Sequence, residues 1–163
     1  MRPSTIAVGA TFLGSAFVVG PAVAIWLSRA CDWPRWNVPA GSIIGGTLIL
    51  AALVIAAYCS NLFSRIGQGT PVPVEPPTRL VAAGLYQYSR NPMYVAHVSL
   101  LLGLFFVRGD LALLVYACLY AGIIHAWVVW HEEPELLQRF GEGYRRYTKE
   151  VPRWLASTHR TVR

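Results

Sequence analysis

The sequence predicts an all-α fold: an integral membrane helical bundle of about four transmembrane helices, followed by a C-terminal amphipathic helix at the membrane interface. The first observation is composition, because 55% of the 163 residues are hydrophobic and only 13% are charged. That balance is too apolar for an ordinary soluble domain. The second observation is that long uncharged runs follow one another and end in a basic, aromatic-rich tail. We therefore expect residues 1–163 to form a single membrane domain.

Uncharged runs define the candidate spans. There are four of them: residues 5–27, 38–63, 92–107 and 111–130. A membrane span needs about 20 apolar residues at a rise of about 1.5 Å per residue, so three of the runs are long enough alone. The run at 92–107 is short. We expect it to cross the membrane with its neighbouring residues placed at the interfaces, or to form a tilted hairpin with the next run through the tight turn at residues 108–110.

The first two runs carry small residues at the spacing of helix contacts. The pairs are Ala10 with Gly14, Ala16 with Gly20, and Gly41 with Gly45. In lipid, such pairs let helix backbones approach closely, and van der Waals contact then drives the association. We expect residues 1–63 to be a two-helix scaffold.

Basic residues indicate the orientation in the membrane. Eleven of the 14 Lys and Arg residues fall near the N-terminus, in the segment 64–91 or after residue 130. By the positive-inside rule, both termini and the segment 64–91 are cytoplasmic, in the inner or plasma membrane. The net charge of +6 is then explained by topology and by attraction to membrane lipids, so nucleic-acid binding is not needed to account for it.

The segment 64–91 is expected to be a Pro-rich cytoplasmic loop that approaches the third run. It contains the stretch RIGQGTPVPVEPP, and proline disfavours helix in the residue before it. The loop is either a linker or a lid over a site, because long loops without secondary structure are uncommon unless functional.

A first polar cluster precedes the third run. Asn91 is expected to cap a helix whose first position suits Pro92. Arg90 then lies at the positive end of that helix and needs an anionic partner, either a lipid phosphate or the carboxylate or phosphate of a bound molecule. Three tyrosines either line a cation site or form an interface belt: Tyr86, Tyr88 and Tyr94.

A second polar cluster closes the fourth run. If the helix continues, four residues share one face: His125, Val129, Glu132 and Leu136. Glu132 and Glu133 precede an expected helix break at Pro134. They are either solvated acids at a helix start or carboxylates that hold ribose hydroxyls or an ammonium group. His125 is either a hydrogen-bonded core histidine or a functional group at membrane depth. We expect no metal site, because His131 lacks a second histidine four residues later.

The tail after Pro134 has the pattern of an amphipathic helix. Apolar and aromatic residues recur at three and four residues: Leu137, Phe140, Tyr144, Tyr147 and Val151. We expect this helix to be interrupted at Gly141 and Gly143, to lie in the interface with its aromatic side toward the membrane, and to cover the site from the cytoplasm.

These two clusters resemble a known superfamily. RNPMY at residues 90–94 and HEEPELLQRFGEGYRRYTKEVPRW at residues 131–154 are similar to the isoprenylcysteine carboxyl methyltransferase and phospholipid methyltransferase superfamily of integral membrane enzymes. Members share an Arg-(His/Asn)-Pro-x-Tyr motif and a tail with Glu-Glu-x-x-Leu, Phe-Gly, Tyr-x-x-Tyr and Val-Pro. The resemblance covers roughly the C-terminal half. Asn91 replaces the histidine of eukaryotic members, Ala96 a glycine and Ala156 a proline.

The resemblance implies methyl transfer from S-adenosylmethionine to a lipophilic acceptor, such as an isoprenylcysteine-like carboxylate or another lipid. It implies that the hairpin 92–130 and the tail 131–163 enclose the cofactor. The implied cofactor-binding residues are Tyr86, Arg90, Asn91, Tyr94, His125, Glu132, Glu133 and Leu136. Arg90, Glu132 and Arg153 are the implied catalytic residues, with Arg153 positioning an acidic substrate.

Two other functions remain compatible with the sequence. Membrane sterol reductases have a similar C-terminal half and bind NADPH, although they carry many more spans. A small membrane scaffold or transport component, without enzymatic activity, would use the same polar clusters only as interface anchors.

Overall fold

The computed structural model describes residues 3–36, 39–67 and 78–154, and the side chains from residue 7 onward. Within these ranges the chain consists of helices and connecting loops, and the only β-type pairing is an isolated bridge between Arg35 and Asp110. The all-α membrane bundle predicted from composition is confirmed. Most of the Pro-rich segment, residues 68–77, lies outside the described residues, so its interpretation as a lid stays a prediction.

Each predicted run corresponds to a helix. The elements are α1 (Pro3–Gly14), η1 (Ser15–Val19), α2 (Gly20–Ala30), α3 (Gly41–Leu62), η2 (Phe63–Gly67), α4 (Pro92–Arg108) and α5 (Leu111–Trp127). Because η1 is a π-helical turn, α1 and α2 form one continuous rod. Three helical stretches, Ala7–Ala30, Gly41–Gly67 and Leu111–Glu150, are long and apolar enough to cross a membrane, and α4 is a shorter apolar helix.

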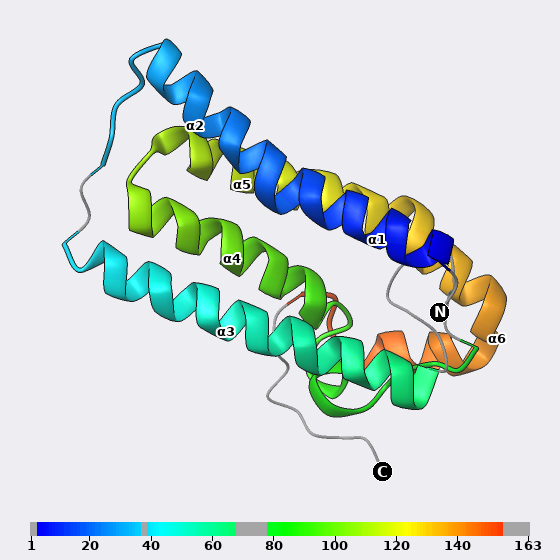
Figure 1. Cartoon of the computed structure of the whole chain (residues 1–163). Coiled ribbons are helices and arrows are strands. Elements are labelled where there is room, and N and C mark those ends of the chain that lie inside the picture. The colour runs from blue at the N-terminus through cyan, green and yellow to red at the C-terminus, as the bar shows by residue number, and fades with distance from the viewer. Residues whose placement is uncertain (1–2, 37–38, 68–77, 155–163) are drawn as a thin grey trace.

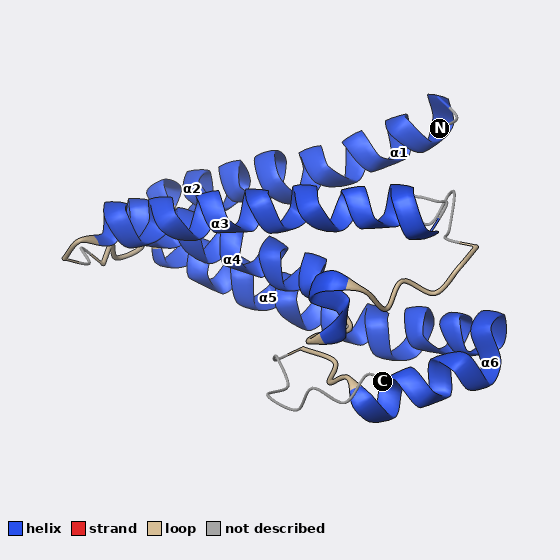
Figure 2. Ribbon diagram, turned by 90° about the horizontal axis from the view of Figure 1, so that it is seen from below, coloured by secondary structure: helices blue, strands red, loops and turns tan. Residues whose placement is uncertain are grey.

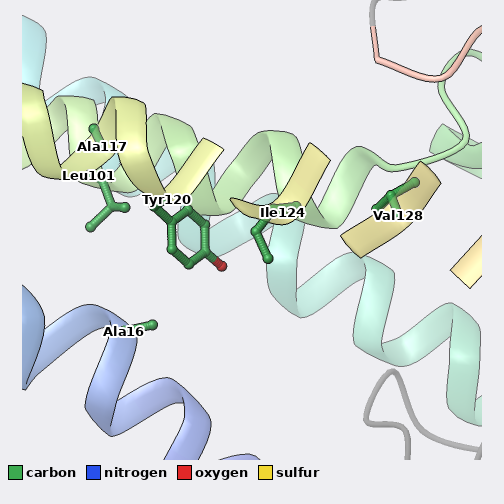
Figure 3. Packing of buried hydrophobic residues seen from close by; sticks show 6 residues of the cluster. All are labelled: Ala16, Leu101, Ala117, Tyr120, Ile124 and Val128. Carbon is green, nitrogen blue, oxygen red and sulfur yellow. The ribbon is translucent and has the colours of Figure 1, made fainter. Parts of the chain in front are cut away.

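The helices form a bundle in which α4 lies between α3 and α5, and α2 packs on the other side of α5 (Figure 1). The central hydrophobic cluster joins three of these rods. Ala16 of η1 and Leu101 of α4 face a row on α5 and the following turn, made of Ala117, Tyr120, Ile124 and Val128 (Figure 3). The start of α1 and the C-terminal helix lie at the same end of the bundle (Figure 1). The side of the membrane that this end faces stays a prediction.

Glycines set the closest helix contact. A Cβ atom on Gly45 of α3 would clash with the carbonyl oxygen of Gly103 in α4, and a Cβ on Gly103 would meet Ile49 and the Gly45 carbonyl. Gly20 likewise lies against the Tyr116 ring. Gly45 therefore packs as its spacing predicted, whereas Gly20 leaves room for a side chain and not for a helix backbone. Gly14 does not, since no described atom comes within 4 Å of its Cβ position.

We expect Gly45→Val to destabilise the protein, because a larger side chain at a backbone contact forces helices apart and overpacking costs about 1–3 kcal/mol. The purified protein should unfold at a temperature about 3–10 °C lower. Gly46→Val is the matched control, since a Cβ at Gly46 meets no described atom within 4 Å. Equal unfolding temperatures for the two variants would contradict this packing.

The turn between α4 and α5 is as tight as predicted. Gly109 ends α4 with φ of 70°, a left-handed conformation that favours glycine, and a Cβ there would clash with the carbonyl group of Trp36. Asp110 follows at once and α5 begins at Leu111. The two helices therefore follow each other as a hairpin.

The expected helix break at Pro134 is wrong. The chain continues from α5 through a π-helical turn, η4 (Val128–Glu132), into α6 (Glu133–Glu150), with Pro134 in the first turn of α6. A proline in that position is tolerated because its missing N–H belongs to a turn in which hydrogen bonding already changes pattern. The chain turns instead at Gly141, with φ of 53° and ψ of −126°. Gly143 stays helical, so only one of the two expected interruptions occurs.

The aromatic face of α6 packs on protein, which corrects the expectation that it faces the membrane. Beyond Gly141, α6 folds back below the loop that precedes α4 (Figure 2). Tyr144, Tyr147 and Val151 are buried there against Leu80 and Ala82 of that loop. This contact holds the tail beside the start of α4.

Candidate functional site

The site is built where the start of α4 meets the start of α6. Glu133 lies between two arginines from different segments. Its Oε1 accepts hydrogen bonds from Arg90 Nη1 at 2.9 Å and from Arg153 Nε at 2.7 Å, and its Oε2 accepts one from Arg153 Nη2 at 2.9 Å. The side chains of Arg90 and Glu133 are only 12% and 17% exposed. These are charge-assisted bonds, bidentate for Arg153, in a partly dry setting.

Glu133 thus supplies an anionic partner for Arg90. Arg90 lies beside the N-terminus of α4, where a cation needs compensation, and the chain provides it without a lipid or a ligand. The same carboxylate raises the pKa of the Arg153 guanidinium by hydrogen bonding. Two guanidinium groups thus share the one carboxylate of Glu133.

Glu132 is held separately from its neighbour. Its Oε2 accepts a hydrogen bond from the Tyr94 hydroxyl at 3.0 Å, one turn into α4. Among the described residues, no partner is recorded for its other oxygen, Oε1. The two adjacent acids therefore differ, because Glu133 is saturated by guanidinium groups and Glu132 retains a free acceptor.

Backbone contacts attach the tail to the start of α4. The Arg90 N–H donates to the Pro152 carbonyl oxygen at 2.9 Å, and the Arg153 carbonyl oxygen accepts from Ser89 Oγ at 3.3 Å and Asn91 Nδ2 at 3.2 Å. Asn91 does occupy the N-cap position before Pro92. Its side chain makes no capping bond, however, and its Nδ2 donates to the tail instead.

Arg90 has a buried donor that the described part of the chain leaves unused. Its Nε is buried, and no described residue accepts a hydrogen bond from it. A buried donor without a partner costs about 1–3 kcal/mol, so a bound acceptor at this point would stabilise the site.

Tyr86 lies at the edge of this cluster. It sits in the 3-10 turn η3 (Gly84–Gln87) and packs with Cys59 and Val81, while its carbonyl oxygen accepts a 2.6 Å hydrogen bond from the Tyr147 hydroxyl. Burial raises the pKa of the Tyr86 phenol well above its usual range. The phenol therefore stays neutral in its apolar cluster with Cys59 of α3, and the Tyr86 carbonyl anchors α6 to the loop.

His125 does not share one regular helical face with Glu132 and Leu136. The π-helical turn η4 lies between His125 and Glu132 and changes the helical register. His125 is exposed and its Nδ1 accepts a hydrogen bond from Trp154 Nε1 at 3.1 Å. Leu136 packs in the apolar cluster of Tyr144. The expected face at residues 125, 129, 132 and 136 is thus split.

Sequence patterns name Arg153 but miss the contacts that the tail segment 152–154 makes. In the structure Arg153 binds Glu133, its role toward a substrate stays a prediction, and the contacts of Ser89 and of the Pro152 carbonyl were not anticipated. The available signal was a basic residue directly after the Val-Pro pair. Within the described ranges, no group of three or more His, Cys, Asp or Glu side chains could hold a metal ion.

The hydrogen-bonding groups of Arg90 and Glu132 are complementary to those of an α-amino acid zwitterion. Arg90 offers an unused N–H to a carboxylate, and Glu132 offers a free oxygen to an ammonium group or a hydroxyl. Tyr94, in the first turn of α4, reaches Glu132 with its hydroxyl, so its ring lies close to this acid, where an aromatic face could border a cation.

Comparison with known families finds a match over the central part of the chain. The family model described as Phospholipid methyltransferase matches residues 41–143, which include α3, the hairpin α4–α5, both acids and the first part of α6. No curated protein matches the chain.

Proposed function

Since this chain belongs to the phospholipid methyltransferase family, we propose that it uses S-adenosylmethionine to methylate a lipophilic acceptor. At the coarser level the chain is a membrane methyltransferase, because the residues that match the family belong to a bundle of apolar helices. One observation carries the finer proposal: Arg90 and the acids at 132 and 133, from separate stretches of chain, come together at one end of the bundle.

The roles of the residues follow from their contacts. Arg90, through its unused N–H, would receive the cofactor carboxylate, and Glu132, through its free oxygen, would receive the ammonium group or the ribose hydroxyls. Glu133 and Arg153 would hold Arg90 in position. Bound S-adenosylmethionine supplies an electrophilic methyl group on a sulfonium.

Methyl transfer needs an in-line approach and exclusion of water more than acid–base assistance. This chain supplies those through its packing. Tyr144, Tyr147 and Val151 seal the tail against the loop before α4, and apolar helices adjoin the polar cluster, so an acceptor would enter from the lipid. Residues 131–163 would then cover the cofactor, residues 92–130 would form the hairpin beside it, residues 64–91 would form the approach loop and residues 1–63 the scaffold.

The acceptor is proposed as a lipid with a nucleophilic carboxylate or amine. The test incubates the purified protein with methyl-labelled S-adenosylmethionine and a total lipid extract, then separates the lipids. We expect label in the organic phase, in one lipid class. Label that stays with unreacted cofactor would contradict the proposal. Retained NADPH after purification would favour a reductase, and failure to bind either cofactor would favour a scaffold.

A further inference from the structure

A second charged cluster lies at the opposite end of the bundle, far from the site described above. Asp110, in the turn between α4 and α5, is fully buried. Its Oδ1 accepts a hydrogen bond from Arg35 Nε at 2.8 Å, and its Oδ2 accepts one from Arg108 Nε at 3.1 Å. Arg35 comes from the loop after α2, so the carboxylate brings together two arginines that are far apart in sequence.

These arginines line a cavity of about 560 Å³. Its wall is made by the end of the loop after α2, the first turn of α3 and the end of α4, and it includes Trp36, Ser42 and Gly109. Trp36 is held there because its backbone N–H donates to the Gly109 carbonyl oxygen at 2.7 Å. Three packed segments therefore form the cavity.

The charges around this cavity favour an anion. Two guanidinium groups face one carboxylate, which leaves one positive charge in excess. Asp110 engages the Nε atoms only, and among the described residues no partner is recorded for the terminal nitrogens of Arg35 or Arg108. Ala40 gives α3 no side-chain cap, so the uncapped first N–H groups of that helix add a further partial positive charge to the wall.

The cavity lies at the ends of the apolar helices, which is the depth of the lipid headgroups in a membrane. The apolar helix α3 begins there and α4 ends there. Trp33 and Trp36 beside it are 44% and 60% exposed, as is typical of tryptophans at a membrane interface.

We propose that this cavity binds a phosphate group, most directly that of an anionic phospholipid in the leaflet opposite the methyl-transfer site. Asp110 orients the two guanidinium groups and leaves their terminal N–H groups to the phosphate oxygens, a geometry suited to paired hydrogen bonds. This assignment is independent of the proposed methyl transfer, because it involves none of the residues placed in that site.

The test places a negative charge in the cavity without touching the Asp110 network. Ser42 is exposed, lines the cavity and lies in the first turn of α3, where an acid is favourable for the helix. We expect Ser42→Glu to weaken binding of dioleoylphosphatidylglycerol about tenfold through charge repulsion, while Ser42→Gln, of matched size, binds as the unchanged protein does. Binding is measured by native mass spectrometry of the full chain in detergent, and dioleoylglycerol, which lacks phosphate, should not bind.

A second pair of variants checks the arginines. Arg35→Gln should also lower binding, whereas Arg29→Gln should not, because Arg29 is an exposed residue at the end of α2 that does not line the cavity. Competition by millimolar inorganic phosphate would show that the site accepts free phosphate as well, and lack of competition would assign it to the lipid. Equal binding by Ser42→Glu and Ser42→Gln, or by Arg35→Gln and Arg29→Gln, would overturn the proposal.

Discussion

Glu133→Gln is expected to lower the thermal unfolding midpoint of the purified protein by about 5–10 °C and to reduce methyl transfer at least 100-fold, if the proposed function holds. The carboxylate of Glu133 accepts three hydrogen bonds from Arg90 and Arg153. Glutamine has the same shape but no charge, so it leaves a guanidinium that is only 12% exposed without compensation. Breaking such a pair by neutralising one partner costs roughly 3 kcal/mol.

Glu135→Gln is the matched control for this change. Glu135 lies two residues further along α6 and pairs with Arg139 at 2.7 Å, but its side chain is 50% exposed. Exposed pairs of this kind contribute about 0.3–0.5 kcal/mol, so its unfolding midpoint and activity should stay close to those of the unchanged protein. If both variants unfold at the same temperature, Glu133 does not have the central position assigned to it.

The helices of this fold could be predicted because their signal is local. Uncharged runs long enough to span a bilayer define α1–α2, α3 and α5, and small residues at four-residue spacing locate the contact at Gly45. Gly14 shows the limit of this pattern, since spacing cannot reveal whether a neighbouring helix is present. Pro134 shows a second limit of sequence patterns. A proline ends a helix only where the preceding turn cannot change its hydrogen bonding, and here a π-helical turn accommodates the proline.

The site was only partly predictable, because its contacts join elements that sequence periodicity treats separately. The motifs at residues 90–94 and 131–154 indicated that Arg90 and the two acids belong to one site. Nothing in their spacing showed that Glu133 would be occupied by two arginines while Glu132 keeps a free oxygen. Asn91 illustrates the same difficulty, since its capping position was evident but its actual acceptor, the Arg153 carbonyl, comes from the tail. The partners of these side chains depend on the kink of α6 at Gly141, which brings the tail back toward the start of α4.

The difference between the two adjacent acids leads to the second strong prediction. Glu132→Gln should weaken binding of S-adenosylmethionine about 10–100-fold in a calorimetric titration, because a charged hydrogen-bond acceptor contributes about 1.5–3 kcal/mol. The unfolding midpoint should change little, since a glutamine oxygen can still accept the Tyr94 hydroxyl hydrogen bond. Glu133→Gln should lower both stability and activity, whereas Glu132→Gln should lower binding alone.

Glu142→Gln controls for the loss of an acid from α6. Glu142 is 65% exposed and its contact with Arg145 spans 3.7 Å, so its replacement should alter neither cofactor affinity nor stability.

Tyr94→Phe adds a finer comparison, because it removes the hydroxyl that orients Glu132 and keeps both the acid and the aromatic ring. We expect its affinity to fall between those of the unchanged protein and Glu132→Gln. Unchanged affinity in Glu132→Gln would remove this carboxylate from the cofactor site, and the free oxygen beside Tyr94 would then need another explanation.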